Sequence, residues 1–232
     1  MHESQPVNPE NGRTNLLLFL LFGFFAVFNI SAVIIQNLSG EAPNAHGTIV
    51  DMFTGSILWM ASMVALLTAV KRYPDIQRVF LWLGVSAGAA AFAIDEMFEI
   101  HEQTIYMFGE DDYIKIAMML FALSGLILLY RMERPSRQVI QLFAFGFLLH
   151  LCYLAVDFGD GDFFQLPFSI DSLYWAEEAF EMLAVQTYFA GLAVFYTSQA
   201  HLAFQEVASG SANPNERFTL AKAGFQADTA GA

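Results

Sequence analysis

The chain has 232 residues and a formal net charge of −13; 56% of its residues are hydrophobic and 14% are charged, against roughly 25% in ordinary soluble domains. One soluble core of this size could not bury so much apolar surface, so a lipid bilayer is the simpler solvent. The negative charge argues against nucleic acid as a partner, and the single cysteine, Cys152, excludes an intramolecular disulfide framework.

Six apolar stretches have about the length of a membrane-spanning helix, which is roughly 20 residues. The first apolar run is too long for the core of a cleavable signal peptide, and polar segments with Gly or Pro separate most of the stretches. We therefore predict an all-α polytopic membrane bundle, with a polar segment over 1–14, a six-helix transmembrane domain over 15–206 and a disordered tail over 207–232. The predicted helices cover 15–36, 48–70, 79–106, 113–130, 139–158 and 173–196, with a surface extension of the last one to Glu206.

Basic residues predict the orientation. They gather in the second and fourth connections, over 71–78 and 131–137, whereas the odd-numbered connections carry almost none. Because connections rich in Lys and Arg stay in the cytoplasm, both termini are expected there and the first, third and fifth connections outside. We expect an integral protein of a bacterial inner membrane, with the lipid bilayer as its main partner.

The third predicted helix ends in a dense run of acidic residues. Asp95, Glu99 and Glu102 follow one another at i, i+4 and i+7, so they share one face of a helix. Glu96 and His101 point away from that face. Acidic side chains at membrane depth are usually functional, which makes this run the first candidate site.

The sixth predicted helix begins with a second acidic run. Glu177 and Glu181 share a face there, and Glu178 lies one turn from Glu181. In both runs an acidic residue and Glu are followed by any residue, Phe and Glu. The likeness predicts a duplicated three-helix unit of inverted topology, as in many transporters, with coincidence as the alternative because about a dozen residues match.

In the expected orientation both acidic runs lie in the outer half of the membrane. Asp157 ends the fifth predicted helix on that side, with His150 and Tyr153 on its face, and Asp51 and His46 open the second helix there. A charge at the bilayer centre costs roughly 2.5–3.5 kcal/mol on insertion scales. Carboxylates persist at that depth by sharing protons, facing water or binding cations.

The third solution predicts a divalent-metal site. Carboxylates and imidazoles on facing helices are the ligands of metal centres in helical bundles, and they suit iron, manganese or zinc better than copper(I). Such a site would make the protein a metal-dependent membrane oxidoreductase or hydrolase acting on a lipid-like substrate. The Glu-x-x-His pattern of the usual di-iron bundles is absent from both runs. The predicted ligands are Asp95, Glu99, His101, Glu102, His150, Asp157, Glu177, Glu178 and Glu181.

Other interpretations stay open. Paired carboxylates and an inverted repeat also fit a proton or cation transporter or channel, although no helix carries the Gly or Pro break that often marks such a site. A non-catalytic subunit of a membrane complex, or a homo-oligomer, would use the acidic rim to dock a partner. Glu102, Glu177 and Glu178 are also explained by a wetted rim, and His150 by core packing. The small residues over 84–91 predict close helix packing.

Overall fold

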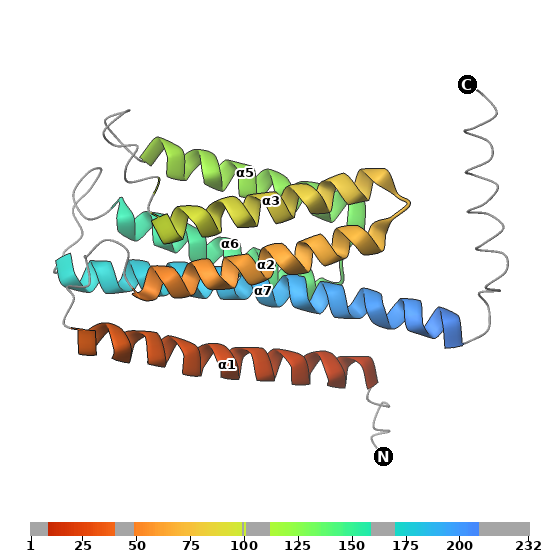
Figure 1. Ribbon diagram of the computed structural model, residues 1–232, viewed down its shortest axis with the longest axis horizontal. Helices are drawn as coiled ribbons and strands as arrows, with labels where there is room; N and C mark the ends of the chain where they lie inside the picture. The colour runs from red at the N-terminus through yellow and green to blue at the C-terminus, as the bar shows by residue number, and fades with distance from the viewer. Residues whose placement is uncertain (1–8, 40–48, 99, 101–111, 159–169, 209–232) are drawn as a thin grey trace, which may run out of the picture. The chain divides into compact units, whose positions relative to one another are not determined.

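A computed structural model of the chain describes residues 9–39, 49–98, 100, 112–158 and 170–208. In this part of the chain every regular element is an α-helix and there is no strand, so the predicted all-α fold is confirmed there. The chain divides into two compact units, Met1–Phe195 and Tyr196–Ala232, and the second begins within the last helix. The helices are α1 (Pro9–Ser39), α2 (Ile49–Arg72), α3 (Ile76–Phe98), α5 (Asp112–Glu133), α6 (Arg137–Asp157) and α7 (Ile170–Ala208) (Figure 1).

Two helices extend much further than predicted. α1 begins at Pro9, well before residue 15, and proline suits a first helical position because its φ matches the helix and no N–H bond is lost. α7 runs without a break from Ile170 to Ala208, so the extension predicted after residue 196 continues the helix itself. The predicted end of the third helix, at residue 106, and most of the tail over 207–232 lie outside the described residues.

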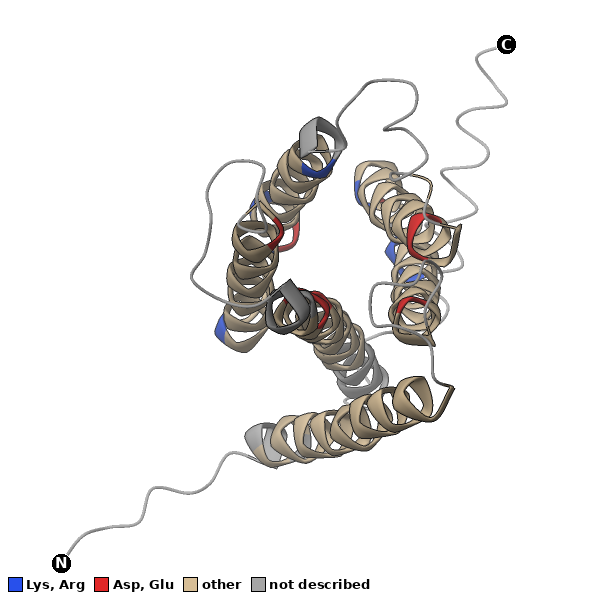
Figure 2. Ribbon diagram, turned by 90° about the vertical axis from the view of Figure 1, so that its left-hand side faces the viewer, with Lys and Arg blue, Asp and Glu red and all other residues tan. Residues whose placement is uncertain are grey.

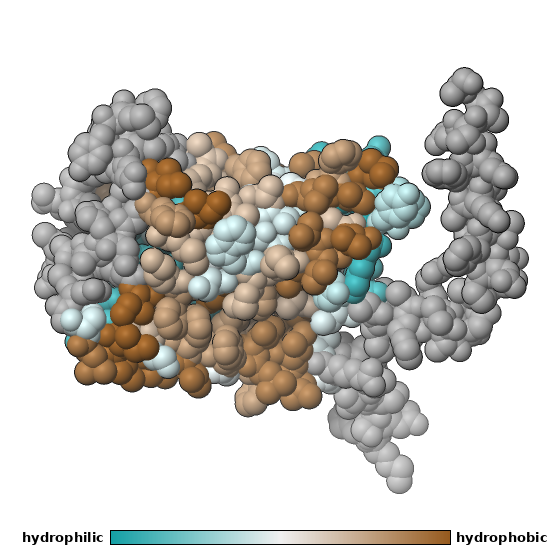
Figure 3. Space-filling view, in the orientation of Figure 1, coloured by the Kyte–Doolittle hydropathy of each residue, from teal (hydrophilic) through white to brown (hydrophobic). Residues whose placement is uncertain are grey.

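All six helices are long and apolar enough to cross a membrane, by length and composition. Their candidate spans have 19 to 26 residues, close to the roughly 20 that a bilayer requires. Large apolar side chains lie on the outside, as Phe19, Leu38 and Phe80 do with exposed fractions of 75%, 80% and 68%. Figure 3 shows such side chains over much of the face in view. A surface of this kind is unfavourable in water, so the structure is compatible with the predicted membrane protein.

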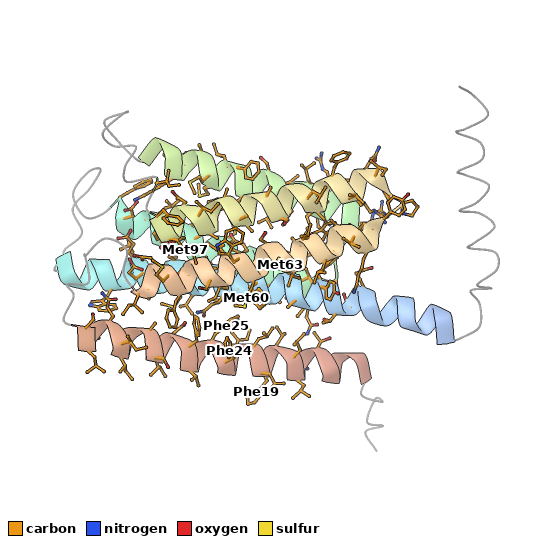
Figure 4. All side chains as sticks on the ribbon, in the orientation of Figure 1. Phe19, Phe24, Phe25, Met60, Met63 and Met97 are labelled. Carbon is orange, nitrogen blue, oxygen red and sulfur yellow. The ribbon has the colours of Figure 1, made fainter. Side chains whose placement is uncertain are left out.

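Small residues hold α2 and α3 together as an antiparallel hairpin. Ser62 Oγ donates a hydrogen bond to the carbonyl oxygen of Ser86 at 2.9 Å, and Ser86 Oγ donates one to the carbonyl oxygen of Ser62 at 3.0 Å. This reciprocal pair satisfies both hydroxyls inside the apolar contact. Towards the start of α2, Gly55 lies against Met97, whose side chain is labelled where α3 passes α2 in Figure 4.

α1 is joined to the bundle by side-chain hydrogen bonds and by aromatic packing. Asn29 and Gln186 of α7 exchange two side-chain hydrogen bonds, and the one from Asn29 Nδ2 to Gln186 Oε1 is 3.1 Å long. Phe25 is 2% exposed, and its ring packs edge-on to Phe189 with 6.0 Å between the centroids. In Figure 4 Phe25 lies between α1 and the neighbouring helices, whereas Phe19 points away from them. One face of α1 is therefore packed and the other is apolar and exposed.

A buried ion pair lies at the opposite end of the bundle from the acidic runs. The side chain of Glu133, at the end of α5, is only 1% exposed. It accepts hydrogen bonds from Arg72 Nε at 3.0 Å and from Trp82 Nε1 at 2.7 Å, and Arg72 makes a second bond to its other oxygen. The ring centroid of Phe195 on α7 lies 5.0 Å from that of Trp82 and 5.5 Å from Cζ of the Arg72 guanidinium. Residues of α2 and α3 thus bind one carboxylate of α5, and Phe195 of α7 packs against both of its donors.

Glu133→Leu should destabilise the fold by roughly 3–5 kcal/mol, because Arg72 and the Trp82 N–H lose their acceptor. Adding Arg72→Met removes the stranded charge and should recover part of the loss. Equilibrium unfolding in detergent micelles measures both, and strictly additive losses would contradict the coupling. Arg78→Met is the matched control: Arg78 and Asp75 form an exposed pair, so stability should change by less than about 1 kcal/mol.

Gly55→Val should lower the unfolding temperature. A Cβ at this position would lie 2.8 Å from Met97 Cγ and 3.2 Å from the carbonyl oxygen of Ala93, and overpacking of this kind typically costs about 1–3 kcal/mol. Gly23→Val makes the same change in α1, where a Cβ meets nothing within 4 Å. Thermal unfolding in detergent compares the two, and equal unfolding temperatures would mean that the α2–α3 contact is not tight.

Candidate functional site

A cavity of about 400 Å³ lies among α3, α5, α6 and α7, with α2 at its edge. Its walls are apolar over most of their length, with Leu81, Val85 and Phe92 contributed by α3. Its polar groups concentrate at one end, where α3 and α6 end and α5 and α7 begin. Figure 2 looks towards that end and shows acidic residues in red on several helices. The titratable residues that line the cavity are Asp95, Glu96, Lys115, His150, Tyr153, Glu181 and Tyr188.

Two carboxyl groups from different helices meet at this polar end. The side chain of Glu96 on α3 comes within hydrogen-bonding reach of Glu181 on α7. Asp95 beside it is 9% exposed, and Asp51 and Glu178 lie close enough for their charges to act on Glu96. Carboxyl groups in such contact either share a proton or hold a cation between them, because two bare carboxylates repel each other.

A second polar group joins α5, α6 and α7 nearby. Lys115 Nζ donates to both carboxylate oxygens of Asp157 at 2.9 Å, and the two side chains are 12% and 14% exposed. Glu177 of α7 comes within hydrogen-bonding reach of Asp157 and interacts with the charge of Lys115. The ammonium group thus offsets two acids from two other helices, which gives Asp157 a partner other than a metal ion.

Tyr153 of α6 interacts with the charges of both groups, and His150 lies one turn before it on the same helix. Tyr153 is 8% exposed, and the charges of Glu96 and Glu181 on one side and of Asp157 on the other act on it. The His150 ring lies 5.4 Å from the Tyr153 ring, and both line the cavity. Imidazole and phenol groups both donate and accept hydrogen bonds, so they can pass protons beside the carboxyl pair.

The nine predicted ligands fall into three sets. One set surrounds the polar end of the cavity, another joins the Lys115 ion pair, and the third lies outside the described residues, as does His46. The first set is Asp95, His150, Glu178 and Glu181, the second is Asp157 and Glu177, and the third is Glu99, His101 and Glu102. Within the described ranges, no three His, Cys, Asp or Glu residues are grouped so that they could hold a metal ion.

Glu96 and Lys115 are site residues that the sequence analysis did not single out. The predicted acidic face passes beside Glu96. The α3 residues that line the cavity recur at helical spacing, however, from Leu81 through Val85 and Phe92 to Glu96, and this apolar stripe leads directly to the missed carboxylate. The sequence also offered a way to find Lys115. A single basic residue near the acidic end of an apolar helix needs an acidic partner.

Part of the small-residue stretch over 84–91 lines the cavity, which the prediction of close packing did not anticipate. A Cβ at Gly84 would meet nothing within 4 Å, whereas one at Gly88 would lie 3.1 Å from the Phe121 ring of α5. Gly84, Gly88 and Ala89 all line the cavity. The lack of side chains therefore leaves space between α3 and α5, while Ser86 supplies the close contact with α2.

The comparisons with known proteins place the chain in a family. A family model described as Domain of unknown function (DUF8692) matches residues 16–195. The chain belongs to this family. The DUF8692 match includes every described residue that lines the cavity, together with both polar groups at its end. No curated protein and no solved structure matches the chain.

In this DUF8692 domain Lys115→Met should destabilise the fold, because Asp157 and Glu177 would then face each other without a cation. Removing one partner of a buried ion pair costs roughly 3–5 kcal/mol, and this partly exposed pair should lie at the lower end. Adding Asp157→Asn should restore part of the stability. Thermal unfolding in detergent measures both, with Lys71→Met as the same change at an exposed position. Wild-type stability of the Lys115→Met variant would rule out the role of this pair.

Proposed function

We propose that the chain is an integral membrane protein that binds a divalent metal ion, either iron, manganese or zinc, at the polar end of its cavity. The observation that carries this proposal is the meeting of Glu96 and Glu181, from two helices, beside the buried Asp95. Carboxylates on facing helices are the arrangement with which helical bundles hold such metals. A cation between the two groups would also remove their mutual repulsion.

The described residues supply part of the proposed ligand set. Glu96 and Glu181 would be ligands from α3 and α7, with Asp95 or Glu178 beside them. Glu99, His101 and Glu102 follow α3 in the sequence and stay predicted ligands. Since the described residues alone form no group of three that could hold a metal, a complete site needs at least one donor from outside the described ranges, and we propose that this following run supplies it.

The cavity suggests what such a metal would act on. Its apolar walls fit a lipid-like substrate, and its polar end would bring the reacting group of that substrate to the metal. A bound metal supplies Lewis-acid chemistry or an activated water. His150 and Tyr153 would move protons beside it. The proposed class is a metal-dependent oxidoreductase or hydrolase of the membrane.

A proton or cation transporter is the second candidate, because the Glu96–Glu181 contact also suits a shared proton. The unbroken course of α3, α6 and α7 through the described ranges counts against it, since transporters often interrupt helices at their sites. The duplicated three-helix unit stays a sequence prediction. Proton or cation flux into proteoliposomes that is unchanged by Glu96→Gln and Glu181→Gln would refute the transporter.

A non-catalytic subunit or homo-oligomer is a third proposal, which co-purification tests.

We further propose that both termini face the cytoplasm, in a bacterial inner membrane, with the polar end of the cavity towards the outside. Basic residues support this orientation, because Lys71 and Arg72 end α2 and Arg131 lies in the last turn of α5, opposite the acidic end. The positive-inside rule then assigns that basic end to the cytoplasm. Cysteine accessibility at the two ends of the bundle measures the orientation directly.

Metal analysis of the purified protein should find stoichiometric iron, manganese or zinc. Glu96→Gln and Glu181→Gln should each remove most of it, because a neutral amide is a poorer ligand for these cations than a carboxylate. Inductively coupled plasma mass spectrometry on protein from detergent or nanodiscs gives the stoichiometry.

Two variants serve as controls for this measurement. Asp75→Asn makes the equivalent change at an exposed position at the start of α3 and should keep the metal. Glu177→Gln should also keep it, because Glu177 lies in the Lys115 group. Substoichiometric metal in the unmodified protein, or metal content unchanged by Glu96→Gln and Glu181→Gln, would refute the proposal.

A further inference from the structure

The cavity is long and narrow. Its lining extends along α3 from Leu81 to Glu96 and along α5 from Lys115 to Leu129. At about 1.5 Å per residue each of these stretches is about 20 Å long. Because a volume of about 400 Å³ is spread over that length, the cavity is narrow, and its width suits one extended carbon chain whose atoms pack about 4 Å from their neighbours. A helix, about 10 Å across, is too wide to enter.

The cavity opens sideways between α3 and α5. Phe80 on α3 and Phe121 and Leu128 on α5 line it, and their side chains are 68%, 60% and 49% exposed. These side chains lie within candidate membrane spans, so the opening faces the region that lipid chains fill. An apolar chain could enter from the bilayer without crossing water.

The polar end selects the group at the end of such a chain. Asp95, Glu96 and Glu181 line this end, and Lys115, the one Lys or Arg among the described lining, is already paired with Asp157. A carboxylate or phosphate would meet net negative charge there at low dielectric constant, because three carboxylates carry more charge than one shared proton or one divalent ion offsets. A hydroxyl or an amine would instead donate hydrogen bonds to the carboxyl groups.

We propose that the cavity binds a single-chain amphiphile that ends in a hydroxyl or amine, with its chain along α3 and α5 and its polar end at Glu96 and Glu181. The shape and apolar walls of the cavity support the binding of a single chain. The acidic end supports the choice of a hydroxyl or amine. The inference deepens the proposed function by naming the class of substrate for the same site, and it rests on that function only in calling the bound molecule a substrate.

Photo-crosslinking in nanodiscs tests the proposal with the full chain. The probes are a long-chain alcohol and an amine with a diazirine in the chain, and a fatty acid of the same length. Gly84→Leu and Gly125→Leu should fill the cavity, and the new side chain can start without strain because a Cβ at either glycine meets nothing within 4 Å. Gly23→Leu is the matched control, an equally open glycine on α1 that does not line the cavity.

Mass spectrometry should locate the alcohol and amine labels on peptides of α3 and α5. Labelling should fall to background in Gly84→Leu and Gly125→Leu and persist in Gly23→Leu. Equal labelling of all variants would overturn the chain-binding part, and fatty acid labelling as strong as that of the alcohol would overturn the choice of polar group. Metal content on the same samples separates the two proposals: labelling without metal refutes only the metal site, and metal without labelling refutes only this inference.

Discussion

A carboxylate inside a membrane-crossing helix is costly unless another group compensates its charge, and this constraint governs how the helices are placed. Glu133 is the clearest case. Its side chain is almost completely buried, and it is compatible with that position because Arg72 and Trp82 both donate to it and Phe195 covers the group. Since these partners come from α2, α3 and α7, one carboxylate at the end of α5 fixes the relative positions of four helices.

The same constraint has two different solutions at the other end of the bundle. Asp157 is compensated by Lys115, a base supplied by the protein itself. Glu96 instead meets Glu181, a second acid. Acid against base is a complete structural solution, whereas acid against acid needs a proton or a cation that the side chains of the pair do not supply. This difference, and not the number of acidic residues, separates the candidate site from the structural ion pairs.

Hydropathy predicts the six helices because a run of about 20 mainly apolar residues has the length of a membrane-spanning helix. Alternating helix direction also brings the acidic runs to one end, as the sequence implies. Rotation about each helix axis is what the sequence leaves open. Asp95 and Glu96 differ by about 100° around α3. A modest error in the predicted rotation of this helix therefore puts the wrong one of these two carboxylates in the site. The pairing of Arg72 with Glu133 was missed for a related reason, because partners 61 residues apart share no local pattern.

Two ion pairs also explain why a cavity can persist beside α5. An ion pair ties each end of this helix to the bundle, Lys115 to Asp157 at its start and Glu133 to Arg72 at its end. Between them, Gly84 on α3 and Gly125 on α5 present no side chain, and a Cβ at either would meet nothing within 4 Å. Charge pairing therefore holds α5 in place where apolar packing is incomplete, and the space left between the two ion pairs is the cavity that ends at Glu96.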